Sequence, residues 1–338
     1  MNNKIPFKIL PIALAGFIFF SCTNTSSVEK RNSDSIAMSE DSLIQKQFEL
    51  SEMKTNWNKH AVALDSIHDG GPGKNDIPAI DFPEFVNVTD AHRFLTEPDF
   101  GILINRDGQQ KFYPLKILNW HEVVNDVSGN LPVAITFCPL CGSAIVYNRI
   151  VDGDTLLFGV SGKLFESNMV MFDEKTESLW SQAMGESIAG DLTGKKLQLV
   201  NSAIISFEDL LKLYPAAKVL SINTGYERNY NEYAYADYNN NDELYFPVSK
   251  KSNQFENKDI VYAVRTANLS VAFYWKDLLK YQSATVNTTD GTVVVKVENF
   301  IPVAVIKESG KELNGYFSYW FSWYAVNGEN GIVWNSKR

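Results

Sequence analysis

The chain has 338 residues and a formal net charge of −9, and 45% of its residues are hydrophobic. This composition supports a buried core and excludes a disordered or fibrous chain. The acidic balance, with no run of Lys and Arg among the aromatic residues, argues against binding of nucleic acid. The sequence has neither a P-loop nor a G-x-G-x-x-G motif, so no nucleotide partner is expected.

The first 21 residues have the pattern of a bacterial export signal. Two lysines precede an apolar run from Ile9 to Phe20, which is too short for a spanning helix, and Ser21 then precedes Cys22. A small residue followed by cysteine is typical of lipoprotein cleavage, so we predict a signal peptide over residues 1–21 and a lipid such as palmitate on Cys22. The alternative is a plain secretory signal that leaves Cys22 as a free thiol.

This signal predicts a protein of the bacterial cell envelope, anchored by lipid and facing the periplasm or the exterior. Cleavage removes two lysines and no acid, so the net charge falls from −9 to −11. Acyl chains hold such a body at a membrane, whereas an anionic lipid surface repels it. The lipid anchor is therefore the only expected membrane contact, and the sequence does not identify a substrate or protein partner.

The remainder divides into a polar stalk and a folded domain. Residues 22–74 are mostly polar, with a weak amphipathic helical pattern over residues 40–60, and the turn-rich segment HDGGPGKND (residues 68–76) links them to the domain. From residue 75 to residue 338, short apolar runs alternate with turn residues. This pattern predicts a β-rich α+β domain.

Within the domain, two segments have helical patterns, residues 114–126 and residues 206–215. In the second, Ser206 and Asp209 resemble a capping box and Pro215 ends the helix. The expected strands are residues 101–106, 132–137, 143–151, 155–162, 169–173, 178–182, 217–222, 259–265, 271–275, 292–298, 302–308 and 315–326.

A faint internal repeat predicts that the domain consists of two similar halves forming one globular unit. Its matches, all displaced by 161 residues, are Phe112-Tyr113 with Phe273-Tyr274, Leu118 with Leu279, Trp120 with Tyr281, Val133 with Val294 and Ile145 with Ile306. Chance similarity between strand-rich segments is the alternative. At this offset, the reactive residues of the first half face Gln282, Asn299 and Pro302, so the chemistry is expected in the first half alone.

Candidate chemistry is concentrated in Asn119–Asp126 and Phe137–Ala144. The C-P-x-C-G turn resembles a zinc knuckle, in which Cys138 and Cys141 point at one metal. His121, on the preceding helix, is the expected third ligand, with Glu122 or Asp126 as an acid behind the ligands. Two thiolates and an imidazole suit Zn(II) or Cu(I).

Two other interpretations of the cysteine pair remain open. Outside the cytoplasm, Cys138 and Cys141 can form a structural or redox disulfide, and they can also be inert buried thiols. A thioredoxin-like redox motif normally begins a helix, whereas the residues after Gly142 have a strand pattern. The sequence therefore assigns no catalytic residue and leaves open whether the protein is an enzyme.

The blocks YPLKILNWHEVVND, FCPLCGSAIVYNR, FGVSGKLFESNMVMFD and TESLWSQAMGESIAGDLTGKKL resemble the bacterial and archaeal family called domain of unknown function 3179. The resemblance covers about residues 75–335. It implies an exported or lipid-anchored globular domain and supplies no activity. The family's hallmark positions correspond here to His121, Glu122, Asn125, Asp126, Cys138, Cys141, Gly142, Ser161, Gly162, Asp173, Trp180, Ser181 and Gln182.

Two functions follow as hypotheses. The first is an envelope lipoprotein with a metal- or thiol-dependent site formed by His121, Cys138 and Cys141. The second is a non-catalytic binding module with a structural disulfide, which recognises a glycan or a protein through aromatic residues such as Trp320, Phe321, Trp323 and Tyr324. The apolar density of that segment instead favours a strand inside the core.

Overall fold

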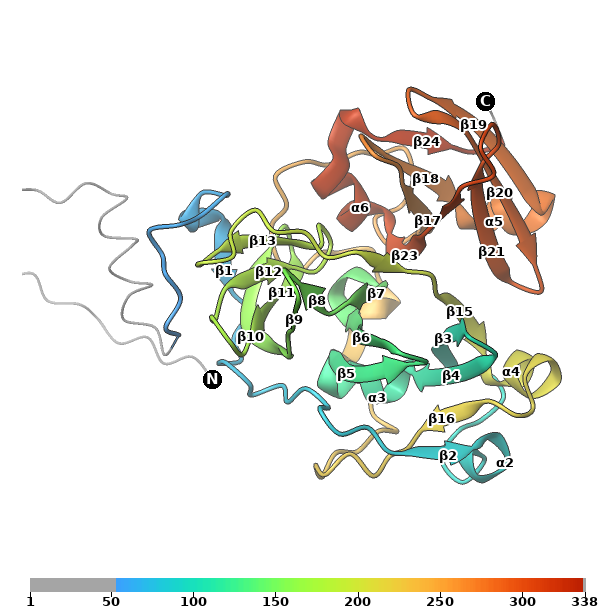
Figure 1. Ribbon diagram of the computed structural model, residues 1–338, viewed down its shortest axis with the longest axis horizontal. Helices are drawn as coiled ribbons and strands as arrows, with labels where there is room; N and C mark the ends of the chain where they lie inside the picture. The colour runs from blue at the N-terminus through green and yellow to red at the C-terminus, as the bar shows by residue number, and fades with distance from the viewer. Residues whose placement is uncertain (1–52, 337–338) are drawn as a thin grey trace, which may run out of the picture. The chain divides into compact units, whose positions relative to one another are not determined.

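The structure, a computed structural model, describes residues 53–336 and has a strand-rich α+β fold (Figure 1), which confirms the expected fold class. The predicted signal peptide, Cys22 and the stalk up to residue 52 lie outside the described residues. None of the helices formed by residues 53–336 has the length and apolarity needed to cross a membrane.

The first half, residues 100–220, begins with a sheet built around one hairpin. Strands β3 (Phe100–Arg106) and β4 (Gln109–Pro114) form the hairpin, β15 (Ala203–Ser206) pairs with β3, and β16 (Lys218–Leu220) runs parallel to β4. Strand β2 (Phe85–Asn87) completes the edge and leads into the short helix α2 (Val88–Ala91).

Between β15 and β16 lies the helix α4 (Phe207–Leu213), as predicted. The Ser206 hydroxyl accepts a hydrogen bond from the backbone N–H of Asp209 at 3.0 Å, which is the expected cap.

Helix α3 (Leu115–His121) connects β4 to a meander of β5 (Val123–Ser128), β6 (Leu131–Cys138) and β7 (Ser143–Asn148). The predicted helix over residues 114–126 is therefore too long at its end. It stops because Glu122 adopts a left-handed conformation with φ of 56°. The β-branched residues that follow then pair with β6 instead.

The second half, residues 260–334, repeats this order of elements. A hairpin is followed by a helix, a meander, a returning strand, a second helix and a parallel strand. These elements are β17 (Ile260–Arg265), β18 (Ser270–Tyr274), α5 (Trp275–Tyr281), β19 (Ser283–Thr288), β20 (Gly291–Glu298), β21 (Ile301–Ile306), β22 (Glu312–Leu313), β23 (Gly315–Tyr319), α6 (Trp320–Asn327) and β24 (Ile332–Trp334), with the 3₁₀ turn η4 (Gly328–Asn330) after α6. Strand β23 pairs with β7 and joins the halves in one sheet (Figure 1).

The strand registers show how the halves correspond. Val123 faces Thr136 in β5–β6, and Ser283 faces Lys296 in β19–β20, an offset of 160 residues rather than the predicted 161. The turn from β6 to β7 is two residues longer than the turn from β20 to β21, so the offset after it is 158. Origin of the halves by duplication stays a prediction.

The halves differ most in the segment that follows the meander. In the first half, residues 149–202 are inserted between β7 and β15; we call them the inserted segment. It contains β8 (Ile150–Val151), β9 (Asp154–Thr155), β10 (Phe158–Phe165), β11 (Asn168–Asp173), β12 (Leu179–Ser181), β13 (Glu186–Ala189) and β14 (Leu199–Val200). In the second half, only residues 307–314 separate β21 from β23.

The folded body begins N-terminal to the predicted boundary at residue 75. Strand β1 (Ile67–Asp69), which follows the 3₁₀ turn η1 (Leu64–Ser66), pairs with β10, and Met53 and Trp57 are buried in the core under the sheet of the inserted segment. The described part of the predicted stalk therefore packs on the domain, because its few apolar residues are spaced to cover that sheet.

The aromatic run over residues 315–326 is interior, but only its first part is a strand. The chain changes from β23 to the helix α6 at Trp320. Trp320, Phe321 and Trp323 are buried, so these three residues do not form an aromatic binding surface. A helix that is apolar on all sides has no periodicity to distinguish it from a buried strand, which explains the error.

Candidate functional site

The two cysteines lie on a tight turn between β6 and β7. Cys138 ends β6, the 3₁₀ turn η2 (Pro139–Cys141) follows, and Gly142 turns the chain with φ of 51°. A Cβ atom at Gly142 would lie 2.5 Å from the ring of Tyr319, so this glycine is required for space as well as for conformation. A 3₁₀ turn brings residues three apart to about 6 Å between Cα atoms, which is within the range of a disulfide.

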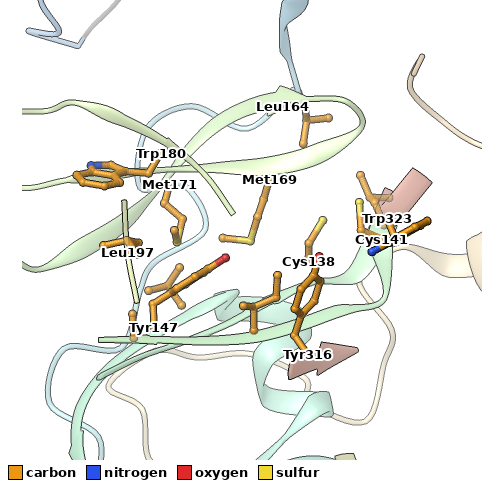
Figure 2. Close-up of a cluster of buried hydrophobic side chains, with 14 of the residues drawn as sticks. Cys138, Cys141, Tyr147, Leu164, Met169, Met171, Trp180, Leu197, Tyr316 and Trp323 are labelled. Atoms are coloured by element: carbon orange, nitrogen blue, oxygen red, sulfur yellow. The ribbon is translucent and has the colours of Figure 1, made fainter. Parts of the chain in front are cut away.

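Both thiols are free and enclosed. Cys138 is 1% exposed and Cys141 is 0% exposed. The Cys141 thiol donates a hydrogen bond to the backbone carbonyl of Ser167 at 3.1 Å. Figure 2 shows both sulfur atoms inside the main core cluster, with Met169 and Leu164 across from Cys138. The disulfide, which the sequence left open as an alternative, is not present in this structure, although the turn allows it.

Glu122 is an acid close enough to this turn for its charge to act on Cys138. Its backbone carbonyl accepts a hydrogen bond from Phe137 N at 2.8 Å, which holds it beside the end of β6 that carries Cys138. The Glu122 side chain is 4% exposed, and its Oε1 accepts a hydrogen bond from the Tyr235 hydroxyl at 2.8 Å. A carboxyl group is therefore buried with one phenol as its partner.

Burial shifts the proton equilibria of both groups. Loss of hydration raises the pKa of Glu122 from 4.5 to about 7, and the hydrogen bond from Tyr235 opposes this shift. Burial also raises the pKa of the Cys138 thiol well above its usual range, and the neighbouring Cys141 thiol and the Glu122 carboxylate raise it further. At neutral pH the thiol is therefore protonated beside a carboxyl group that is close to half ionised.

Glu122 and Cys138 line the same small cavity, of about 60 Å³. Its walls come from four parts of the chain: the α3–β6 region, the inserted segment, residues 70–78, which we call the strap, and residues 221–259, which we call the tyrosine-rich loop. This loop contains the 3₁₀ turn η3 (Ala236–Asn240) and contributes Tyr235 and Phe246 to the wall.

His121 does not join the cysteines, which corrects the predicted three-residue site. Its Nδ1–H donates to the carbonyl of Pro78 at 2.7 Å, so its Nε2 is the acceptor for the Tyr230 hydroxyl, also at 2.7 Å. Burial lowers the pKa of His121 to about 4, so the ring is neutral at physiological pH. With both nitrogen atoms occupied, the imidazole fixes the strap and the tyrosine-rich loop and is not free to bind a metal.

Asp126 is also separate from the thiols. Its carboxylate accepts hydrogen bonds from Lys111 Nζ and from the Tyr113 hydroxyl, each at 2.7 Å. Asp126 pairs with Val133 of β6. Val133 is five residues before Cys138 in that strand, so the two positions are roughly 17 Å apart along it. Asp126 therefore forms a structural ion pair with Lys111 and is not the acid beside the cysteines.

A buried polar network lies next to the turn. The amide of Gln182 accepts hydrogen bonds from Ser143 Oγ at 2.7 Å and from Asn168 Nδ2 at 2.8 Å, and it donates to Thr136 Oγ1 at 3.0 Å. These bonds connect β6, β7 and the inserted segment. A fully satisfied network of this kind fixes the positions of its elements, so Gln182 positions the turn.

Among the residues that line the cavity, sequence reasoning missed Tyr235 and Phe246. Both lie in an irregular polar loop more than 90 residues after the cysteines, and no motif connects the two regions. The only available signal was the density of tyrosine in residues 226–245.

Within residues 53–336, no group of three or more His, Cys, Asp or Glu side chains is arranged to hold a metal ion. The set of His121, Cys138 and Cys141 expected for Zn(II) or Cu(I) is not assembled. The physical reason is the commitment of both His121 nitrogen atoms to Pro78 and Tyr230.

Comparison with known proteins gives one match. A family model described as "Protein of unknown function (DUF3179)" matches residues 74–311, which include the cysteine turn, Glu122 and Tyr235. No curated protein and no solved structure matches the chain. The match covers well over half of the sequence, and the chain therefore belongs to the DUF3179 family.

Proposed function

We propose that Cys138 and Cys141 are a redox-active pair that cycles between a dithiol and a disulfide, with Glu122 as the group that accepts and returns the proton of Cys138. The observation that carries this proposal is the burial of the Glu122 carboxyl, with a pKa of about 7, in the same 60 Å³ cavity as the Cys138 thiol. Perturbed acids in a cavity beside a nucleophile are typical of functional sites.

The chemistry explains why an acid is needed. Oxidation of the pair removes two protons and two electrons, and the attacking group is a thiolate. A thiol buried as deeply as Cys138 cannot release its proton to water, so a neighbouring base has to take it. A carboxyl with a pKa near 7 is available in both protonation states at neutral pH, and Tyr235 orients it through Oε1.

The two alternatives, inert buried thiols and a purely structural disulfide, account for fewer features of the site. Inert buried thiols require no buried carboxyl group beside them, and burying Glu122 costs stability. A purely structural disulfide likewise requires neither a buried carboxyl group nor a cavity beside Cys138. The redox pair explains the acid, the turn geometry and the cavity together.

The cell-envelope location belongs to the proposal and rests on the sequence of residues 1–22. An oxidising compartment suits a pair that alternates between two redox states. We expect a Cys22→Ser variant to leave the membrane fraction or to remain uncleaved in the producing cell, as measured by fractionation and by the mass of the N-terminal peptide. Cleavage and fractionation like those of the parent would contradict the anchor.

A redox titration tests the pair itself. The full chain is unfolded and refolded in glutathione buffers of increasing oxidation, so that both thiols meet the buffer, and is then quenched in acid and alkylated while unfolded. Both cysteines lie in one tryptic peptide, residues 117–149, so a disulfide lowers its mass by about 2 Da and blocks alkylation. We expect one cooperative transition, which is absent in Cys138→Ser and in Cys141→Ser. A peptide that stays fully alkylated at every ratio, or one that never becomes reduced, would overturn the proposal.

A further inference from the structure

The surroundings of Cys138 restrict what can reach it. The cavity holds about 60 Å³, the space of a few water molecules, and Cys138 and Cys141 are only 1% and 0% exposed. A glutathione disulfide or a loop of another protein needs several times this volume beside the sulfur that it contacts. The native fold therefore admits only a substrate of few atoms.

On one side, the strap closes the cavity by tight backbone contacts with β10. Gly70 N donates to Gly162 O at 2.8 Å, and Asn75 N donates to Val160 O at 3.0 Å. A Cβ atom at Gly162 would lie 1.9 Å from Pro72 O, and Gly162 has φ of 74°, so only glycine permits this approach.

On the other side, the tyrosine-rich loop closes the cavity through its phenols. Tyr235 bonds to Glu122, and Tyr238 donates to the carbonyl of Leu140, inside the cysteine turn, at 2.8 Å. Phe246 adds an apolar wall. Both closures are half-exposed segments that these hydrogen bonds and contacts hold against the core.

The lining also selects by charge. Apart from the backbone, its polar groups are Glu122, Cys138, Tyr235 and Lys163, and Lys163 pairs with Asp69 at 3.1 Å. The remaining unpaired charge belongs to the Glu122 carboxylate, which repels anions and attracts a proton donor. A small neutral molecule with an O–H group fits these conditions.

On the basis of the proposed function, we infer that the oxidant of the dithiol is a small neutral hydroperoxide, with hydrogen peroxide as the smallest member. Glu122 takes the proton of Cys138, and the sulfur attacks one peroxide oxygen as the O–O bond breaks. The departing hydroxide receives the proton from Glu122 and leaves as water. Cys138 is then a sulfenic acid, oxidised by two electrons, while the peroxide is reduced.

The second cysteine completes the reaction. The Cys141 sulfur attacks the Cys138 sulfur, the S–OH bond breaks, and the hydroxide leaves as a second water with the Cys141 proton. In total, two thiols and one hydrogen peroxide give one disulfide and two water molecules. A thiol reductant within the same size limit returns the pair to the dithiol and is itself oxidised to a disulfide.

The test compares oxidants of one chemistry and different size. The reduced full chain is mixed with hydrogen peroxide, cumene hydroperoxide or glutathione disulfide, and disulfide formation in peptide 117–149 is followed by mass spectrometry after acid quenching. Each rate is divided by the rate for the same chain unfolded in urea. We expect the normalised rate for hydrogen peroxide to exceed the other two at least tenfold.

Matched variants test whether the cavity wall is what selects among oxidants by size. Phe246→Ala opens its wall and is expected to raise the cumene hydroperoxide rate at least tenfold, with less than threefold change for hydrogen peroxide. Phe255→Ala removes the same side chain from the same core cluster but away from the cavity, and is expected to change neither rate. If Phe246→Ala does not fold, the size series on the parent chain still decides.

Two kinds of failure are distinguishable. Equal normalised rates for cumene hydroperoxide, glutathione disulfide and hydrogen peroxide in the native chain would overturn the inference while leaving the redox pair intact. Absence of the Cys138–Cys141 disulfide with every oxidant would overturn the proposed function and this inference with it.

Discussion

The two halves of the molecule place equivalent backbone positions in opposite surroundings. Glu122 and Gln282 both follow a seven-residue helix with φ of 56° and 58°. Their carbonyls accept equivalent bonds, from Phe137 N at 2.8 Å and from Val297 N at 2.9 Å. Yet Glu122 is buried, whereas Gln282 is exposed.

The difference comes from what covers the helix end. In the first half, the inserted segment, the strap and the tyrosine-rich loop surround Glu122 and the cysteine turn. In the second half, only eight residues replace the inserted segment, and the turn equivalent to Pro139–Gly142 is Asn299–Phe300. The hairpin and the helix are thus common to both halves. The segments that cover the helix end in the first half supply the burial on which the proposed chemistry depends.

Exchanging the acid and the amide between the halves should give the largest effect. We expect Glu122→Gln to slow oxidation of the pair by hydrogen peroxide at pH 7 about a hundredfold, because it removes the base. Gln282→Glu, which introduces an acid at the exposed equivalent, should leave the rate unchanged. Asp126→Asn serves as the control for loss of a half-buried, ion-paired carboxylate in β5 that lies apart from the thiols. Similar slowing by Asp126→Asn would show that the effect is a general loss of structure.

The pH dependence of stability should also separate the halves, because only the first has a buried acid and a buried base. Glu122 has a raised pKa, so its stabilising contribution is present below pH 4.5 and is lost as pH rises to about 7. His121 has a lowered pKa, so its contribution is present above pH 6.5 and is lost as pH falls to about 4. Each of these two pKa shifts corresponds to a change of roughly 3 kcal/mol in the free energy of unfolding.

These two slopes oppose each other between pH 4.5 and pH 6.5, so single variants should expose them. In Glu122→Gln, the free energy of unfolding is expected to increase with pH in this window, and in His121→Asn it is expected to decrease. Urea unfolding at a series of pH values measures both. Parallel curves for the two variants would contradict the assigned pKa directions.

The longer turn of the first half should be less tolerant of a side chain than an open turn. Gly142→Ala places a Cβ atom 2.5 Å from the Tyr319 ring at positive φ, and we expect a loss of about 2–3 kcal/mol. Gly153→Ala has positive φ but open space around it, so about 1 kcal/mol is expected. Chemical denaturation measures the pair, and equal losses would mean that the packing of Tyr319 on the turn is unimportant.

The smallest effect is expected from the partner of the acid. Tyr235→Phe removes the hydrogen bond that lowers the pKa of Glu122, so that pKa should rise further. The pH at which oxidation reaches half of its maximal rate should move upward accordingly, with a loss of about 1 kcal/mol in stability. Tyr226→Phe, at an exposed tyrosine of the same loop, should leave this pH unchanged.

The sequence predicted the strands, helices and turns better than it predicted the segments that cover Glu122 and the cysteine turn. The β-rich class, α4 with its Ser206 cap, and the cysteine turn after a strand follow from local patterns, which depend on neighbouring residues. Helix α6 was missed because a fully buried helix has no amphipathic period. The predicted internal repeat stays a prediction; the strand registers of the two parts correspond at an offset of 160 residues rather than 161, because the matched aromatic pairs occupy positions shifted by one residue.

The residues of the candidate site could be predicted only in part from the sequence, for a physical reason. Cys138, Cys141 and Glu122 are close in sequence and were singled out, with Glu122 in a supporting position. The roles of His121 and Asp126 were wrong because their partners, Tyr230 and Lys111, come from other segments. Burial of an acid depends on which distant loop covers it, and a single sequence with no motif in that loop does not specify this contact.

The most direct test of the central claim is the pKa of the Glu122 carboxyl in each redox state of the pair. Carbon NMR of the chain labelled at glutamate carboxyl groups, with Glu122→Gln for assignment, measures it. We predict a carboxyl that titrates near pH 7 in the reduced protein and at a different pH once Cys138 and Cys141 are joined. A midpoint near 4.5 in both states would contradict the account.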